Sequence, residues 1–221
     1  MSVNRFEYPN RDAWLNARKA IGGSDAACIL GMNPWKTNVE LYLEKTGQRE
    51  PEDISDKELV KYGTDAEAPL RRLFALDHPD LKVHYRRFNM WTNDRYPWAH
   101  ASLDGWLTDK DGRLGVLEIK TTNIMNSRQK EQWHNKIPDN YYIQVLHCMA
   151  ITEADFAVVK AQLKWEIPLC DGRVEVYCQT RHYRIERTDV EADIDYLMSA
   201  EDRFAKNIQY GVKPDQILPE I

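Results

Sequence analysis

An acidic and a basic residue lie two positions apart on an apolar segment near the middle of the chain. This segment, 115–120, reads Gly-Val-Leu-Glu-Ile-Lys. A strand here would point Glu118 and Lys120 to the same face. Burying two charges on such a face is costly unless they pair or bind a metal ion. Upstream, Asp104 lies on the strand predicted before it, and a hairpin turn at 109–112 would bring Asp104 beside Glu118.

The pattern Asp–x(n)–Glu–x–Lys predicts a centre for phosphodiester hydrolysis. Asp104 and Glu118 offer the hard oxygen ligands that Mg²⁺ prefers, and the backbone carbonyl of Ile119 can add a third. Lys120 would orient the attacking water or help deprotonate it, and would stabilise the charge that develops on phosphorus. A second acid–x–Lys triplet, at 80–82, lacks the buried strand context. Taken alone, the triplet at 118–120 is equally consistent with a structural salt bridge at a strand end.

Two further polar residues lie on predicted helices that could reach this centre. Glu67 belongs to a long helix before the strands and could supply another carboxylate to a metal. Gln144 belongs to a helix after them and could reach the same cluster as an uncharged partner. Taken singly, each is more typical of an ordinary helix surface.

Hydrophobic periodicity predicts the elements that must position these residues. Helices are expected at 12–20, 26–30, 39–45, 55–77, 127–134, 140–151 and 189–209, and strands at 81–91, 101–107, 114–120, 154–163 and 173–186. Pro69 inside the 55–77 helix predicts a kink or a boundary just before it. This order implies an α/β fold with a mixed central sheet of about five strands flanked by helices.

The chain length suits a single domain spanning 1–221. It would comprise a helical part at 10–78, a sheet core at 81–165, and a C-terminal strand and helix at 173–210. No apolar run approaches the roughly 18 residues of a membrane span, and the N-terminus lacks a secretory signal, so a cytoplasmic protein is expected. The net charge of −5 argues weakly against broad binding to nucleic acid but leaves room for a local basic site.

The four cysteines do not predict a metal centre. None of them forms a Cys-x-x-Cys pair, so a zinc ribbon is not expected. Cys28 and Cys148 lie in apolar helical stretches and are interpreted as core residues. An iron–sulfur cluster would need four thiolates brought together, and the spacing of Cys170 and Cys178 does not favour it.

Several motifs together resemble a known family. The segment 18–27, Arg-Lys-Ala-Ile-Gly-Gly-Ser-Asp-Ala-Ala, followed by Gly-x-Asn-Pro-Trp at 31–35, resembles the N-terminal signature of the YqaJ-type viral recombinases. That family is similar to lambda exonuclease and belongs to the PD-(D/E)xK nuclease superfamily. The later motifs follow in the family's order, as Gly63-x-x-x-Glu67, Ser102-x-Asp104-Gly105, Glu118-Ile119-Lys120 and Tyr141-x-x-Gln144. The resemblance covers residues 10–150, and the order of the motifs makes it more specific than any one of them.

This resemblance implies a restriction-endonuclease-like fold and a nuclease activity. The implied enzyme is a processive 5′→3′ exonuclease that digests double-stranded DNA to mononucleotides and leaves a 3′ single strand. It would use Mg²⁺ in a two-metal site, with Mn²⁺ as a substitute. The implied metal ligands are Asp104, Glu118, the Ile119 carbonyl and Glu67, the last mainly for the second ion. Lys120 would be the catalytic amine and Gln144 a supporting residue of the active site.

The resemblance also assigns Arg18 and Ser24 to the terminal 5′-phosphate of the DNA. Ser24 lies at a glycine-flanked helix start, where free N–H groups favour a phosphate. Arg18 could add a bidentate contact. Without the family, Gly22 and Gly23 would be interpreted as a turn and Ser24 as a helix cap.

The family further implies that the protein acts on double-stranded DNA ends as a ring-shaped trimer, with a single-strand annealing protein as partner. A bacterial host cell and a phage or prophage origin follow from the same resemblance. Two alternatives stay open. One is another nuclease of the superfamily, of the endonuclease or repair type, and the other is a DNA-end-binding module without catalytic activity.

Three residues outside the motifs are noted for their chemistry. His100 precedes the metal Asp and is interpreted as an ordinary strand residue rather than part of the site. Trp35 and Trp133 are candidates to stack on a base, although most of the seven tryptophans are expected in the core.

Overall fold

The computed structural model describes residues 2–217 and is built on two sheets. The strands are β1 Val3–Glu7, β2 Lys82–His84, β3 Asn89–Asn93, β4 Gly105–Thr108, β5 Leu114–Asn123, β6 Phe156–Pro168 and β7 Val174–Glu186. The larger sheet has the order β2-β4-β5-β6-β7. Strands β5 and β6 pair in parallel, and the other three neighbouring pairs of this sheet are antiparallel. This confirms the predicted mixed sheet of about five strands. Met1 and 218–221, the ends of the predicted 1–221 domain, lie outside the described residues.

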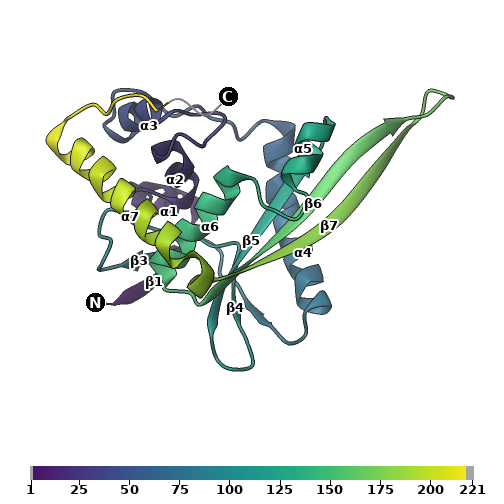
Figure 1. Ribbon diagram of the computed structural model, residues 1–221, viewed down its shortest axis with the longest axis horizontal. Helices are drawn as coiled ribbons and strands as arrows, with labels where there is room; N and C mark the ends of the chain where they lie inside the picture. Colours follow the sequence, from purple (N-terminus) through teal and green to yellow (C-terminus); the bar gives the residue numbers. More distant parts are fainter. Residues whose placement is uncertain (1, 218–221) are drawn as a thin grey trace.

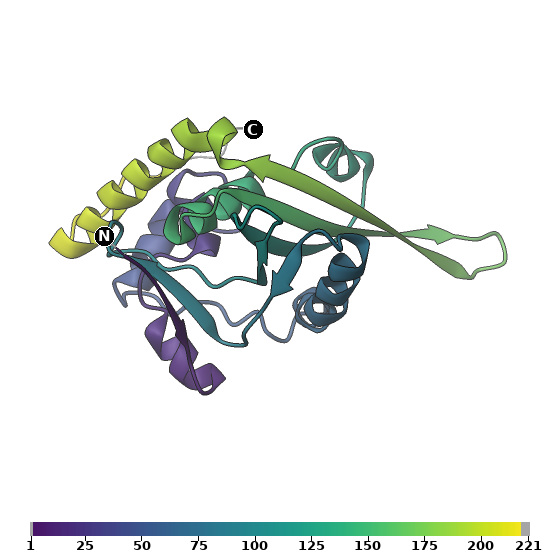
Figure 2. The same cartoon turned by 90° about the horizontal axis from the view of Figure 1, so that it is seen from below.

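Helices cover both faces of the larger sheet (Figures 1 and 2). They are α1 Arg11–Ala17, α2 Gly23–Ile29, α3 Asn38–Lys45, α4 Glu58–Asp77, α5 Ser127–Gln132, α6 Asp139–Thr152 and α7 Arg187–Tyr210. Helix α4 buries Leu70 and Phe74 in a cluster with Leu117 and Ile119 of β5. Helix α6 packs on the other face, beside Val116. Because successive side chains of a strand alternate between faces, Glu118 and Lys120 point to the α6 face.

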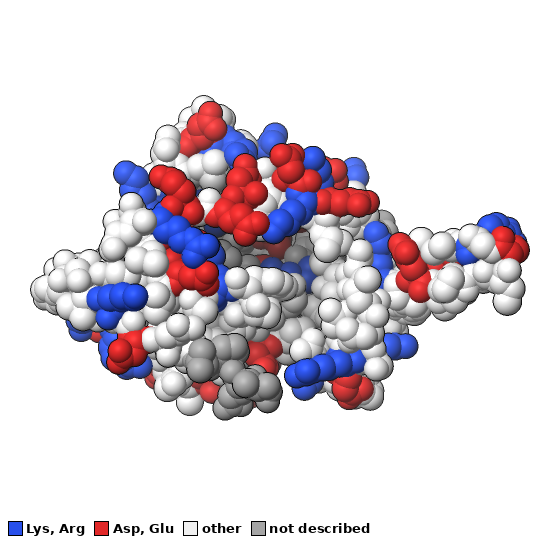
Figure 3. All heavy atoms as spheres, turned by 90° about the horizontal axis from the view of Figure 1, so that it is seen from above, with Lys and Arg blue, Asp and Glu red and all other residues white. Residues whose placement is uncertain are grey.

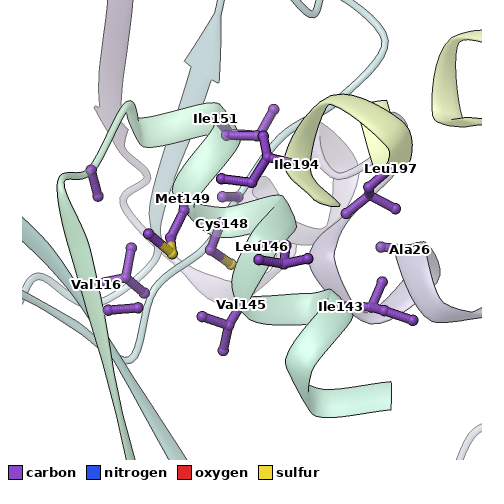
Figure 4. Packing of buried hydrophobic residues seen from close by; sticks show 14 of the residues in the cluster. Ala26, Val116, Ile143, Val145, Leu146, Cys148, Met149, Ile151, Ile194 and Leu197 are labelled. Carbon is purple, nitrogen blue, oxygen red and sulfur yellow. The ribbon is translucent and has the colours of Figure 1, made fainter. Parts of the chain in front are cut away.

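Helix α6 is the central helix of the core. It is apolar around most of its circumference, as is typical of a helix buried on all sides. Figure 4 shows it between Val116 of the sheet, Ala26 of α2, and Ile194 and Leu197 of α7. The helix that carries Gln144 is therefore fixed from three directions.

Strand β5 has one open edge at the level of Glu118. Its pairing with β4 ends at Leu117 and Gly105, whereas its pairing with β6 continues to Asn123. From Glu118 onward, the edge of β5 that faced β4 is therefore free of a neighbouring strand. The strand also needs glycine at 115, because a Cβ there would lie 2.4 Å from the ring of Phe156.

The strand predicted at 81–91 is wrong as a single element. The structure divides it into β2 in the larger sheet and β3, which pairs with β1 in a separate two-stranded sheet. Phe88 has a φ of 56° just before β3, and such a backbone conformation breaks an extended strand. Strand β1 was missed because its side chains are half-buried or exposed and show no apolar alternation. The strand predicted at 101–107 is shortened to β4.

Helix α4 continues through Pro69, so the predicted boundary before that residue is wrong. Proline cannot donate to the carbonyl four residues earlier, which here belongs to Asp65. Both residues are exposed, so water can satisfy that carbonyl. The cost of proline inside this helix is reduced for that reason.

Strands β6 and β7 extend well beyond the rest of the sheet as a two-stranded arm (Figures 1 and 2). They pair antiparallel from Phe156 and Glu186 to Pro168 and Val174. Beyond Lys164, the last residue that faces β5, only these two strands remain. The strand predicted at 154–163 is thus five residues too short at its far end.

No helix within residues 2–217 has the length and apolar character needed to cross a lipid bilayer.

Candidate active site

Three polar side chains meet on the α6 face of β5. Lys120 Nζ lies 2.7 Å from Glu118 Oε1 and 2.9 Å from Gln144 Oε1. The Gln144 amide donates to the same oxygen of Glu118 at 2.6 Å. Glu118 is buried and Lys120 is nearly so. The predicted approach of these three residues is therefore present in the structure.

Asp104 lies one residue before β4 and reaches across the open edge of β5. Its Oδ2 accepts a hydrogen bond from the Ile119 backbone N–H at 2.8 Å. The N–H and C=O of one strand residue point to the same side of the strand. The Ile119 carbonyl therefore also faces this open edge, beside the Asp104 carboxylate. Arg71 of α4 donates to the backbone carbonyl of Asp104 and holds the turn in place.

Glu67 approaches the same region from α4. One helical turn earlier, Gly63 lies against β5, where a Cβ would be 3.3 Å from Thr121 Oγ1. The glycine therefore allows α4 to come close to the strand, which gives the Gly63-x-x-x-Glu67 spacing a structural reason. The charges of Glu118 and Lys120 both act on the Glu67 carboxyl.

Burial, together with neighbouring acids, raises the pKa of two of the site's carboxyl groups. Burial, followed by the charges of Glu118 and Glu67, raises the pKa of Asp104 well above its ordinary value. Burial, opposed by Arg71 and reinforced by Glu118, also raises the pKa of Glu67. Both shifts disfavour the charged carboxylates that a cation would need, and a bound cation would reverse them.

Lys120 is held in its charged form. Burial by itself would lower its pKa, but the charges of Glu118 and Asp104 and the hydrogen bond to Glu118 outweigh it and raise the pKa. An ammonium held in this way cannot act as a base without first losing its proton. It can stabilise negative charge and orient an oxygen nucleophile.

The donor set fits a hard divalent cation. Two carboxylates and a backbone carbonyl are oxygen ligands of the kind that Mg²⁺ takes. The buried Glu118 Oε2 has no hydrogen-bond partner in the described residues, so it is an acceptor without a donor. Across residues 2–217, however, no three His, Cys, Asp or Glu side chains are gathered as in a formed metal site. Binding would require the carboxylates to turn toward the ion.

Figure 3 shows the face that lies at the top in Figure 1, and this face is hollowed at its centre. Acidic and basic side chains lie together in and around this hollow. Although the net charge is −5, this face is not uniformly acidic, because basic side chains lie among the acidic ones.

The two predicted phosphate-binding residues lie on either side of the Gly22–Gly23 pair. Arg18 ends α1, with its guanidinium 4.2 Å from the centre of the Trp14 ring. Burial lowers the pKa of Arg18, against the opposing charge of Asp25. Ser24 is exposed near the start of α2.

Sequence reasoning did not anticipate what the two glycines contact. A Cβ on Gly22 would lie 3.3 Å from the His100 ring, and a Cβ on Gly23 would lie 3.2 Å from Gln144 Cγ. Gly23 therefore allows the start of α2 to lie directly against the helix that carries Gln144, and Gly22 allows the chain to lie against His100. Such a role is visible only once the packing of α2 on α6 is known.

His100 lies in an extended connection rather than a regular strand, and it is buried. Its two ring nitrogens have no hydrogen-bond partner among the described residues. Burial and then the charge of Arg18 lower its pKa to about 3, so the ring is neutral. Its backbone carbonyl accepts from His147, which in turn contacts Glu201 at 2.7 Å. This buried chain fixes the backbone of the segment beside the site.

The two tryptophans considered for base stacking differ in exposure. Trp133 is only 2% exposed, packs against Tyr141 and Tyr183, and is a core residue. Its candidacy is therefore wrong, because a base cannot reach it. Trp35 is 73% exposed and stays accessible.

The cysteines separate into two groups. Cys28 and Cys148 are buried, as predicted for core residues, whereas Cys170 and Cys178 are exposed on the arm. Within the described part of the chain, no three metal-binding side chains of any kind come together.

Comparison with known proteins gives a family for this sequence. The family model of the YqaJ-like viral recombinase domain matches residues 13–155, well over half of the chain. Uncharacterized protein YqaJ of Bacillus subtilis (strain 168) is 35% identical over 148 residues, which cover 66% of this chain and 44% of that protein. The chain thus spans less than half the length of this relative.

Three solved structures with a similar fold are named as exonucleases. The alkaline exonuclease LHK-Exo of Laribacter hongkongensis has a TM-score of 0.60 at 19% identity, covering 90% of this chain and 95% of that one. A second structure of LHK-Exo, in complex with dAMP, also gives 0.60, at 20% identity and the same coverage. A phage related exonuclease from Haemophilus somnus 129PT gives 0.54 at 13% identity, covering 87% and 96%. These likenesses confirm the predicted restriction-endonuclease-like fold.

Proposed function

Because this chain belongs to the family of YqaJ-like viral recombinase domains, we propose that it is a metal-dependent exonuclease that hydrolyses phosphodiester bonds at DNA ends. The observation that carries the proposal is the meeting of Asp104, Glu118, Lys120 and Gln144 at the open edge of β5. The exonuclease names of the structural neighbours are consistent with it.

In this proposal each side chain has a distinct task. Asp104, Glu118 and the Ile119 carbonyl hold Mg²⁺, or Mn²⁺ in its place, and Glu67 completes the site for a second ion. Ions held there would supply an activated water and neutralise charge on the scissile phosphate. Lys120 stays an ammonium and stabilises the negative charge that develops during attack.

Gln144 is proposed to orient the side chains of Glu118 and Lys120. It donates to Glu118 and accepts from Lys120, so it fixes the carboxylate and the ammonium relative to each other. Amide groups of this kind keep the partner side chains oriented without adding charge.

The proposed direction of digestion is 5′→3′ on double-stranded DNA, leaving a 3′ single strand. Arg18 and Ser24 would bind the terminal 5′-phosphate, and their segment packs against Gln144 through Gly23. The dAMP complex of LHK-Exo supports the release of mononucleotides, since dAMP is a product of that type. A homotrimer, a single-strand annealing partner and action in a bacterial cytoplasm during phage-type recombination belong to the same proposal.

Digestion of end-labelled linear duplex in Mg²⁺ or EDTA tests the activity. Mononucleotides should appear from the 5′ ends in Mg²⁺ and not in EDTA. Asp104→Ala, Glu118→Ala and Lys120→Ala should each lower the rate by at least about 100-fold, the usual scale for removing an electrostatic catalytic group. Lys110→Ala, at an exposed turn, is the matched control and should digest normally.

The alternatives give different products. Nicks in closed circular DNA would indicate an endonuclease of the same superfamily instead. Binding of DNA ends without cleavage in any divalent cation, unchanged in Lys120→Ala, would indicate a non-catalytic end-binding module. Normal turnover by any of the three site variants would remove that residue from the mechanism.

A further inference from the structure

The base of the β6–β7 arm carries an aromatic pair with a lysine beside it. Trp165 and Tyr177 face each other across the two strands, with ring centroids 6.0 Å apart and ring planes 10° from parallel. Lys130 of α5 places its Nζ 5.3 Å from the centre of the Trp165 ring. These three residues form what we call the arm platform. Tyr177 is 41% exposed, and the Lys130 side chain is exposed as well.

The arm platform lies on the same face of the sheet as the catalytic lysine. Lys120 pairs with Ala161 in the parallel register, and neighbouring residues in such a pair share a face. Trp165 is four residues further along β6, so it returns to that face about 13 Å away. Tyr141 joins the two, since its ring lies 4.9 Å from Lys120 Nζ and packs in the same cluster as Trp165.

The cations around the arm base have no anionic partner. Lys130 and Lys164 form no salt bridge among residues 2–217, whereas Lys36 and Lys57 are paired with glutamates. Instead, Lys164 lies 3.6 Å from the centre of the Tyr62 ring on the other face of the arm. Among the described lysines that lie over an aromatic ring, Lys120 and Lys160 are salt-bridged, whereas Lys130 and Lys164 are not.

Aromatic faces beside unpaired cations are the chemistry that binds single-stranded nucleic acid. Bases stack on the rings whatever their sequence, and the cations attract the phosphate backbone. Protein interfaces also use tryptophan and tyrosine, so the feature that favours a polyanionic partner is the Lys130 cation without an anionic partner beside the rings.

We propose that the arm platform binds the single-stranded DNA that leaves the active site, by stacking a base on Trp165 and Tyr177 and contacting its phosphate through Lys130. This inference rests on the proposed nuclease function for the source of the strand. It adds a binding surface outside the residues that carry the chemistry.

Fluorescence anisotropy with a labelled oligo(dT) strand, in EDTA, tests this surface without any cleavage. Trp165→Ala should weaken binding by roughly 5- to 100-fold, and Tyr177→Ala, at a more exposed position, should also weaken it. Trp165→Phe should keep most of the affinity. A plot of log binding constant against log salt concentration should be less steep by about 0.7 in Lys130→Ala. This is the slope expected for one phosphate contact to a single strand, because each such contact releases counterions.

Tyr196→Ala on α7, at a tyrosine that is 63% exposed, is the matched control for an exposed aromatic residue and should bind the oligonucleotide as the wild type does. Wild-type affinity in Trp165→Ala, Tyr177→Ala and Lys130→Ala would overturn the proposal. So would a change of oligomeric state in sedimentation with unaltered oligo(dT) binding, because the surface would then belong to a protein contact. Circular dichroism confirms that each variant is folded.

The two proposals can fail separately. Platform-dependent binding of oligo(dT) by a protein that digests no duplex would contradict the proposed nuclease and leave the arm platform standing. If the protein digests duplex ends but its platform variants bind oligo(dT) normally, the proposed nuclease stands and the arm platform is contradicted.

Discussion

Burial and the neighbouring acids together disfavour the charged form of Asp104. Burial is the larger cause of its raised pKa, and the charges of Glu118 and Glu67 add to it. The hydrogen bond from Ile119 N–H opposes the shift but does not cancel it. Perturbed carboxyl groups of this kind are common where charge is concentrated for function.

The first prediction concerns Asp104→Asn in the metal-free protein. Asparagine keeps an acceptor for the Ile119 N–H and removes the charge. Because the folded pKa of Asp104 is raised, its ionisation costs stability as pH rises above the ordinary value of about 3.9. Asp104→Asn should therefore unfold at a higher temperature than the wild type at pH 8, and the two should converge near pH 3.

Thermal unfolding in EDTA measures this difference. A gain of about 1 kcal/mol corresponds to roughly 2–4 °C for a chain of this size. Asp111→Asn, at an exposed turn, is the control and should show no such dependence on pH. A lower melting temperature for Asp104→Asn at pH 8 would contradict the proposed cost of ionising Asp104.

At this scale the sequence predicted which residues would meet but not how they are bonded. The two-residue spacing of Glu118 and Lys120 places them on one face whatever the rest of the chain does. The bridge made by Gln144 depends on how α6 is rotated about its axis. The hydrogen bond from Ile119 N–H to Asp104 depends on where β4 begins. Neither can be obtained from spacing alone.

Among the elements, α4 must lie close to β5 for Glu67 to reach the site. The contact is made at Gly63, where only a glycine fits beside Thr121 without displacement. A Cβ at 3.3 Å from Thr121 Oγ1 would require the helix to shift by a few tenths of an ångström. One turn further along the helix, that shift would be carried to Glu67.

The second prediction uses this contact. Gly63→Ala should keep or raise stability, since alanine favours a helix interior over glycine by about 1 kcal/mol. It should nevertheless lower the rate of DNA digestion several-fold, because α4 moves away from β5. Thr121→Ala removes the obstructing Oγ1, so the double variant should recover most of the activity of Thr121→Ala alone.

Rates of digestion and melting temperatures, measured on the same four proteins, separate the two effects. A Gly63→Ala variant with full activity would show that the position of Glu67 does not depend on this contact. Loss of stability together with activity would indicate crowding throughout the helix rather than a local shift.

The elements themselves were predicted to different degrees. The helices and the central strands follow from apolar periodicity, because these segments bury one face or both. The 81–91 strand was wrong since its apolar alternation hides the break at Phe88, and β1 was missed since it buries little. One strand of the arm was predicted, since the expected 173–186 strand matches β7 Val174–Glu186, whereas the end of β6 beyond residue 163 was missed.

For the molecule as a whole, binding of a cation at one site should be measurable as global stability. A ligand that binds only the folded state stabilises it by about 2.7 kcal/mol when its concentration is 100 times its Kd. In the proposed site, Asp104 and Glu67 would have to be charged to hold the ion, and burial and the neighbouring acids raise the pKa of both carboxyls. Protons would therefore compete with the cation, and we expect its affinity to fall as pH falls.

The third prediction follows from this competition. Saturating Mg²⁺ or Mn²⁺ should raise the melting temperature by roughly 5–10 °C at pH 8, and by clearly less at pH 5, where the raised carboxyl pKa values favour the protonated forms. Differential scanning fluorimetry across a titration of each ion at both pH values measures the effect.

In Asp104→Asn the increase should be largely lost at both pH values, because one ligand charge is gone. An equal increase in wild type and Asp104→Asn would locate the ion elsewhere, and an increase that did not depend on pH would contradict the competition between proton and cation at these carboxylates.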